Sequence, residues 1–159
     1  MMRKYVLSSR KSEKGQSFVE LGLSMVFLIM LLSAVIDLGW AFFTMVALRD
    51  AAQEAATVGA ICPTNFAKVR ARAKASATTP IDMTKFQDSQ IDVCIVTAGS
   101  SACPGTAESV ALGKSVLVTL HYNHQIVTPL VGGIIGTQSY PLTASASNTI
   151  MRTNCDAIP

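Results

Sequence analysis

The residues best placed to do chemistry lie together near the N-terminus, in the stretch Lys14-Gly15-Gln16-Ser17-Phe18-Val19-Glu20. Glu20 is the only charged residue in an apolar run of 20 residues, from position 17 to position 36. An ionised carboxylate near hydrocarbon costs about 2.5 kcal/mol or more on insertion scales, so it needs a partner. Cleavage after Gly15 would create such a partner, because the new α-amino group of Gln16 is a cation. If the chain is cut there, Gly15 and Gln16 form a processing site that supplies this cation.

Glu20 is the predicted assembly residue. The Gln16 amine of a neighbouring subunit could neutralise its carboxylate, and the pair would then form only on assembly. The alternative is that Glu20 lies at the membrane interface and faces water, with no cleavage at all.

The four cysteines are the second candidate set. Cys62, Cys94, Cys103 and Cys155 contain no Cys-x-x-Cys spacing, and four cysteines allow three pairings. We prefer Cys94 with Cys103, which would close a connection rich in Gly, Ser and Pro. Cys62 with Cys155 would then tie the tail to the end of a long helix. Free buried thiols are the alternative, and zinc binding is disfavoured.

No combination of residues predicts catalysis. His121 and His124 are three positions apart on an expected strand, which places them on opposite faces and disfavours a shared metal. The chain has no nucleophile-elbow or phosphate-loop motif. We therefore predict no catalytic residues, no metal, no cofactor and no enzymatic activity.

Positive charge is concentrated at the front of the chain. Residues 1–15 carry a net charge of +4, which leaves −1 for residues 16–159. A nearly neutral remainder offers no basic surface for phosphates, so nucleic acid is not an expected partner. The basic excess is instead typical of a targeting signal.

The apolar run at 17–36 is long enough to cross a membrane. At about 1.5 Å per residue it spans roughly 30 Å, the thickness of the hydrocarbon core. Its basic flank would stay in the cytoplasm. Asp37 and Trp40 follow it, and we expect both near the outer headgroups as markers of the membrane boundary. A specific assembly contact for Asp37 is the alternative.

The remaining patterns predict an α+β fold. A single helix is expected over 16–61, apolar at first and then amphipathic, with a transmembrane half at 17–36. A short second helix should start near Thr64 or Asn65 and end near Ala77. Strands are expected at 91–97, 116–122 and 142–151, forming a small antiparallel sheet on the long helix. Residues 1–15 would be a cleaved leader, and 62–159 an extracytoplasmic α+β domain.

One segment resists interpretation. Residues 126–136 are unusually apolar for a loop and contain Pro129, Gly132 and Gly133. Such a loop either folds against the core or forms an exposed patch for a partner, and the sequence does not decide between them.

The junction and the helix together resemble a known family. A basic leader, Gly15 and a glutamate five residues later are similar to the signature of type IV pilin-like proteins. More narrowly, Gly15 to Glu20, the run into Asp37-Leu38-Gly39 and the alanine-rich stretch 48–56 resemble TadE-like pseudopilins of tight-adherence (Flp-type) pilus systems. The Val-Leu-Val-Thr strand, the segment 128–130 and the Ala-Ser repeat before Met151 extend the resemblance over most of the chain. Trp40 is a departure, because the family often has a basic residue after Asp-x-Gly.

The resemblance implies a function in assembly. It implies a minor pilin or pseudopilin cut after Gly15 by a prepilin peptidase. Its other partners would be pilin-like subunits, the inner-membrane assembly platform and membrane lipid. The chain would be a single-pass protein of the inner (cytoplasmic) membrane, with a cytoplasmic N-terminus and a place in or at the base of the pilus. Two alternatives are an uncleaved signal-anchored domain that binds or catalyses, and a major filament subunit.

Overall fold

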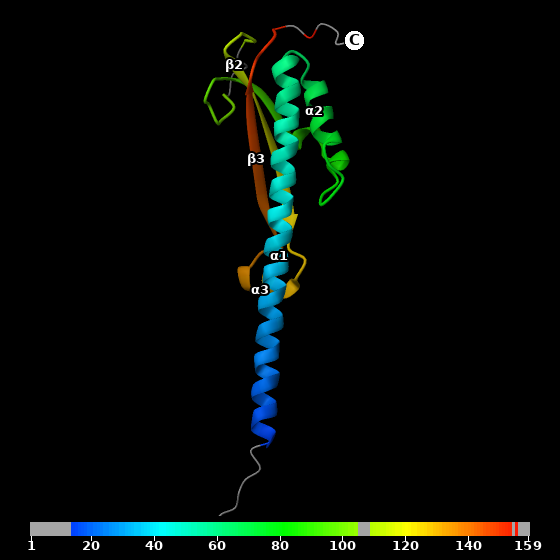
Figure 1. Cartoon of the computed structure of the whole chain (residues 1–159), viewed down its shortest axis with the longest axis vertical. Helices are drawn as coiled ribbons and strands as arrows, with labels where there is room; N and C mark the ends of the chain where they lie inside the picture. The colour runs from blue at the N-terminus through cyan, green and yellow to red at the C-terminus, as the bar shows by residue number, and fades with distance from the viewer. Residues whose placement is uncertain (1–13, 105–108, 154, 156–159) are drawn as a thin grey trace, which may run out of the picture.

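The longest element of the chain is a single unbroken helix. The structure is a computed structural model that describes residues 14–104, 109–153 and 155; residues 1–13 of the predicted leader lie outside it. Helix α1, Lys14–Ile61, contains 48 residues, a length of about 70 Å. Figure 1 shows its N-terminal half standing alone, while the other elements gather around its C-terminal half.

Helix α2, Phe66–Ala75, packs beside the C-terminal half of α1. It starts where expected, because the Asn65 side chain accepts a hydrogen bond from the Lys68 N–H at 3.0 Å. Its buried residues, Val69 and Ala73, face the core. Of the charges expected to form a solvated face, Lys68 and Arg72 are exposed, whereas Arg70 and Lys74 are half-buried against the start of β1 and Asp88.

Three strands form one antiparallel sheet in the order β1-β2-β3. They are β1, Ile91–Thr97; β2, Lys114–Gln125; and β3, Ser139–Thr149. Strands β2 and β3 are longer than expected at their shared lower end, where Gln125 pairs with Ser139. The sequence pattern did not predict this extension, because the polar run His121 to His124 lacks the alternation that is typical of a half-buried strand. The sheet, the long helix and the short helix confirm the α+β fold.

The core lies between α1 and the sheet. Its α1 side consists of Leu48 and a row of small residues, Ala51, Ala52, Ala55 and Ala56, all buried. Small side chains let the helix backbone approach the sheet closely. The closest approach is at Gly59, where an added Cβ would lie 2.7 Å from Val116 Cγ1.

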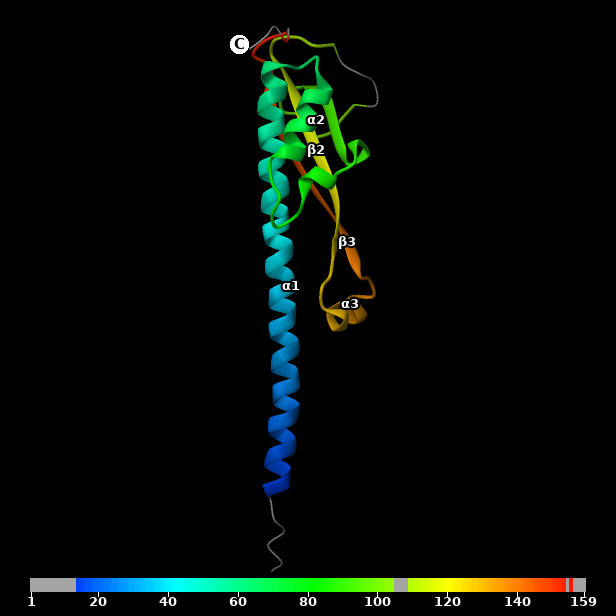
Figure 2. The ribbon, with the colours of Figure 1, turned by 90° about the vertical axis from the view of Figure 1, so that its right-hand side faces the viewer.

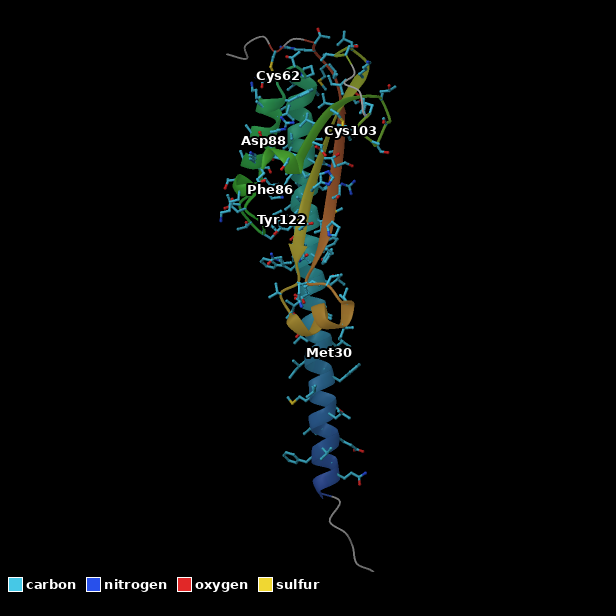
Figure 3. All side chains as sticks on the ribbon, turned by 180° about the vertical axis from the view of Figure 1, so that it is seen from behind. Met30, Cys62, Phe86, Asp88, Cys103 and Tyr122 are labelled. Atoms are coloured by element: carbon cyan, nitrogen blue, oxygen red, sulfur yellow. A yellow bond between two sulfur atoms is a disulfide. The ribbon has the colours of Figure 1, made fainter. Side chains whose placement is uncertain are left out.

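Two single-turn 3-10 helices, Met83–Lys85 and Asp88–Gln90, join α2 to β1. Just after the first of them, the Phe86 ring stacks on Tyr122 of β2, with 5.7 Å between the ring centroids. Figure 3, the view from behind, labels both residues. Phe86 belongs to the buried core, and Tyr122 packs against that core.

The connection between β2 and β3 contains a third helix. Helix α3, Pro129–Ile135, has Pro129 in its first turn and a left-handed Gly136 at its end. Figure 2 shows α3 below the sheet and beside the middle of α1. The sheet therefore extends toward the bare half of α1 and ends in a small apolar helix.

Candidate assembly and membrane-anchoring site

The N-terminal half of α1 exposes apolar side chains on all sides. Large hydrophobic residues are exposed from Phe18 to Val46. The most apolar 18-residue window has a mean hydropathy of 2.4 and no buried residue. In Figure 3, Met30 marks this bare part of the helix. A helix of this length, composition and exposure fits a single-pass membrane anchor.

The exposed apolar surface continues beyond the expected span. Phe42, Phe43 and Val46 lie past position 36 and are 66%, 62% and 42% exposed. Residues 18–46 extend over about 42 Å, whereas the hydrocarbon core is about 30 Å thick. Part of this surface therefore lies beyond a bilayer centred on 17–36.

Glu20 is exposed on the bare half of α1. In the part of the chain that the structure describes, its carboxylate has no hydrogen-bonding or ionic partner. Only its backbone is engaged, since the Glu20 carbonyl accepts a hydrogen bond from Ser24 Oγ at 2.8 Å. The described residues thus offer Glu20 no charge compensation.

Gly15 and Gln16 lie in the first turn of α1, and both are exposed. A side chain at position 15 would meet no atom within 4 Å. Packing within the described chain therefore does not require a glycine at position 15.

Asp37 is turned into the protein, toward the start of the α3 segment. It is 7% exposed, and its Oδ2 accepts a hydrogen bond from the Thr128 N–H at 3.2 Å. Its other oxygen, Oδ1, is buried without a partner in the described chain. Trp40, the other expected boundary residue, is 48% exposed and does not join this contact. Asp37 thus links α1 to the start of α3.

A cavity of about 400 Å³ lies between α1 and the α3 segment. Apart from the Asp37 carboxyl group, its polar lining comes from His124 at the end of β2 and Tyr140 at the start of β3. Its full lining is Ala34, Asp37, Leu38, His124, Ile126, Val131, Ile135 and Tyr140. We call it the α1–α3 cavity.

Burial shifts the pKa values of the two rings that line the α1–α3 cavity, His124 and Tyr140. Desolvation lowers the pKa of His124, and the negative charge of Asp37 partly offsets this. Desolvation, reinforced by Asp37, raises the pKa of Tyr140. His124 is 3% exposed and its Nδ1 has no partner in the described chain. Burial therefore favours the neutral form of the ring over the protonated form.

His121 is separated from this group by the strand itself. It is exposed on the other face of β2, with Nε2 3.1 Å from Asp92 Oδ2 and Nδ1 3.3 Å from Thr143 Oγ1. Among the described residues, no group of three or more His, Cys, Asp or Glu side chains could hold a metal ion.

The cysteines form the two preferred pairs. Cys94 on β1 is bonded to Cys103, nine residues later, and Cys62 is bonded to Cys155, 93 residues later. The second bond joins the residue after α1 to the tail that follows β3. A backbone hydrogen bond from Met151 N to the Ala60 carbonyl, at 2.9 Å, holds the same two segments together.

The apolar segment 126–136 takes both of the roles left open by its sequence. Ile126 is 9% exposed and packs inward, whereas Val127, Ile134 and Ile135 are 72%, 63% and 62% exposed. The segment therefore covers the protein with one side and presents an apolar surface with the other.

Sequence reasoning missed helix α3 and the grouping of Asp37, Thr128 and His124. Pro129 and Gly136 were a usable signal for the helix, since proline favours the first turn and glycine the end. The contact between Asp37 and Thr128 had no comparable signal, because 91 residues separate them.

Comparison with known proteins identifies a family that is similar to part of the chain. The family described as TadE-like protein matches residues 15–57, which confirms the resemblance over most of α1. No curated protein and no solved structure matches the chain. The matched segment begins at the predicted processing glycine and contains Glu20, Asp37 and Trp40.

Proposed function

We propose that this chain, whose residues 15–57 are TadE-like, is a minor pilin-like subunit of a tight-adherence pilus. A prepilin peptidase removes residues 1–15, and the mature chain assembles through α1 with other pilin-like subunits in the pilus or at its base. The TadE-like family is a structural component of pili rather than a family of enzymes.

The observation that carries this proposal is the unpartnered Glu20 on a bare apolar helix. An exposed carboxylate within an apolar surface is costly in a bilayer. A cation supplied by another copy would remove that cost, and cleavage after Gly15 creates one four residues away in sequence. A neighbouring subunit can donate this cation from its own Gln16, and the pair would then form on assembly.

The outer domain supports a minor rather than a major subunit. A major Flp-type pilin resembles the long helix alone, whereas residues 62–159 here add α2, α3 and a sheet. The platform in the inner membrane and the peptidase would contact the cytoplasmic end of α1. The outer domain would remain on the extracytoplasmic side, where disulfides form.

The first test is the N-terminus of the protein purified from its own membranes. We expect a chain that starts at Gln16 and contains 144 of the 159 residues. Gly15→Val should block this cleavage, because the peptidase would have to accept a branched side chain at the junction. Gly22→Val is the matched control, since Gly22 also has no neighbour within 4 Å of its Cβ position.

An intact Met1 on protein taken from assembled complexes would overturn the proposal. The chain would then be a signal-anchored domain that keeps its basic leader, and Glu20 would have no amine to pair with.

A further inference from the structure

The direction of the backbone groups along β3 follows from two hydrogen bonds at its ends. In an antiparallel ladder, alternate residues direct their N–H and C=O groups toward the neighbouring strand, and the others direct both away. The Ile150 N–H donates to the Lys114 carbonyl at 2.8 Å. The Ile126 N–H donates to the Gln138 carbonyl at 2.9 Å. Both bonds join even-numbered residues, and the register between them has no bulge. The odd-numbered residues of β3 therefore direct their backbone groups away from β2.

The outer edge of β3 is open over residues 143–149, which we call the β3 edge. Thr143, Ser145, Ser147 and Thr149 are exposed, and each directs one N–H and one C=O outward. Among the described residues, none of these backbone groups has a hydrogen-bonding partner. The next odd-numbered residue toward α3 is Pro141, which has no N–H to offer. The β3 edge thus presents donors and acceptors over about 20 Å.

The opposite edge of the sheet, on β1, is used by the chain itself. The odd-numbered residues of β1 face outward, because they are level with the β2 residues that bond to β3. At one end of β1, the Ile91 carbonyl accepts a hydrogen bond from Arg70 Nε at 3.2 Å. At the other end, the Thr97 carbonyl accepts one from the Ser100 N–H at 3.0 Å. The two edges therefore differ, since the β1 edge is closed at both ends.

The β3 edge also lacks most of the devices that protect sheet edges. Natural proteins protect an edge strand with charged side chains, prolines, bulges or a covering segment. Residues 115–151 contain no Asp, Glu, Lys or Arg, and Pro141 lies at one end only. Such an edge is a template for another strand, which gains main-chain hydrogen bonds along its whole length.

A second copy of the chain does not fit the β3 edge. Strand β3 runs in the same direction as α1, because Ser139 follows α3 beside the middle of α1, and Met151 N bonds to the Ala60 carbonyl near the end of α1. Two β3 edges paired antiparallel would point their α1 anchors in opposite directions. A parallel pair needs an offset of one residue, so two copies related by a two-fold axis cannot form it. The β1 edge of another copy is closed at its ends.

We propose that the β3 edge receives a β-strand from a different pilin-like subunit anchored in the same membrane. The added strand exchanges main-chain hydrogen bonds with the odd-numbered residues of the β3 edge, and the sheet continues into the partner. Its side chains on the outer face are Ser, Thr or β-branched, because such residues pair well with a row of hydroxyl groups. This inference rests on the proposed function, since it identifies the surface by which the outer domain contacts an assembly partner.

The experiment is amide hydrogen exchange, resolved at single residues, on two preparations of the mature chain. One is the native complex purified from its own membranes, and the other is the chain alone in vesicles. Mass spectrometry identifies the subunits in the complex. We expect the amides of Thr143, Ser145, Ser147 and Thr149 to exchange about tenfold more slowly in the complex, or slower still. The even-numbered amides, already bonded to β2, should change little.

Ser145→Pro should prevent strand addition without opening the sheet. It removes an N–H that is directed away from β2, a position at which an edge strand tolerates proline. The urea midpoint of the chain alone should stay near the wild-type value, whereas recovery of the partner subunit should fall about tenfold. Ser145→Ala is the matched control, because it removes the hydroxyl group but keeps the N–H, and it should recover the partner normally. If Ser145→Pro does not fold, the exchange rates of the wild-type chain still decide the question.

Equal exchange of the four edge amides in both preparations would overturn the inference. If the complex then still contains other pilin-like subunits, the proposed function stands without this contact. Slow exchange in the chain alone, increasing with its density in the vesicles, would also overturn the inference, because a second copy would then occupy the edge. A complex without any other pilin-like subunit would contradict the proposed function as well.

Discussion

Two carboxylates on α1 meet opposite environments. Glu20 is exposed with no partner, whereas Asp37, 17 residues later, is buried under the α3 segment. When only the sequence is considered, both are isolated acidic residues on an apolar helix. Only the fold separates an acid that is open to another molecule from an acid that the chain covers itself.

Substitutions at Glu20 should affect assembly without affecting folding. Glu20→Ala should leave cleavage, membrane insertion and the outer domain intact, because no described residue contacts the carboxylate. Co-purification with other pilin-like subunits should fall at least tenfold. Glu20→Gln should be nearly as defective, because it keeps the shape but lacks the charge that a buried amine requires. Pull-down from membranes and surface-pilus counts measure both effects.

Wild-type assembly by both Glu20 variants would contradict the pairing. Glu20 would then be a residue at the interface that faces water. The variant Glu54→Gln is the matched control, since Glu54 is on the same helix but pairs with Arg72 at 3.2 Å on the outer domain.

His124 should make the outer domain sensitive to acid. Burial lowers its pKa in the folded state below the usual value of 6.5, so its contribution to stability is full above that value. It is lost as the pH falls toward the folded pKa, because the unfolded chain takes up the proton first. The urea midpoint, measured by pulse proteolysis, should therefore decrease between pH 7 and pH 5.

His124→Phe should flatten this decrease, because phenylalanine keeps a ring between Tyr122 and Tyr140 without a titrating group. His121→Gln, on the exposed face of β2, should keep most of it. A decrease that is unchanged in His124→Phe would show that another group carries the pH dependence.

At the scale of elements, the periodicity of the sequence predicted which helices and strands form better than it predicted the residues at which they end. The long helix, the Asn65 cap and the β1 strand at 91–97 follow from local patterns that one element contains by itself. The lower ends of β2 and β3 do not, because Asn123 and His124 pair with Pro141 and Tyr140 across the sheet. That pairing is stabilised by partners distant in sequence, so no local alternation reveals it.

Gly59 tests the packing of α1 on the sheet. Gly59→Ala should destabilise the outer domain by about 1–2 kcal/mol, because its Cβ would overlap the stiff, buried side chain of Val116. The loss should exceed the gain in helix propensity, about 0.5–1 kcal/mol. Gly39→Ala is the control, since its Cβ meets nothing within 4 Å. Equal urea midpoints for the two variants would contradict the close approach.

At the scale of the whole molecule, the two disulfides should contribute unequally. The Cys62–Cys155 bond closes a loop of 93 residues and the Cys94–Cys103 bond a loop of nine. By loop entropy they contribute about 4–5 and about 2–3 kcal/mol, respectively. Replacing Cys62 and Cys155 together by serine should therefore lower the urea midpoint more than replacing Cys94 and Cys103.

Thiol labelling of the unfolded, unreduced protein measures the bonds directly. Protein from the native compartment should show few free thiols. Quantitative labelling of all four cysteines would contradict both disulfide bonds.

The overall division into a bare and a covered half of α1 was accessible from the sequence, since it follows the change from uniformly apolar to amphipathic residues. The position of α3 beside the middle of α1 was not accessible from the sequence. It depends on the length of the β2–β3 hairpin, and hence on where two strands end rather than on any property of residues 126–136 alone.

The covalent link at the top of α1 determines how the molecule bears mechanical load. Cys62 immediately follows α1, and its bond to Cys155 closes the whole outer domain into a ring. Tension applied to the chain on either side of these two cysteines passes from α1 through the sulfur bridge and bypasses the sheet. A pull that would unravel an open chain strand by strand therefore leaves this domain folded, and only reduction of the bridge would expose it to the force.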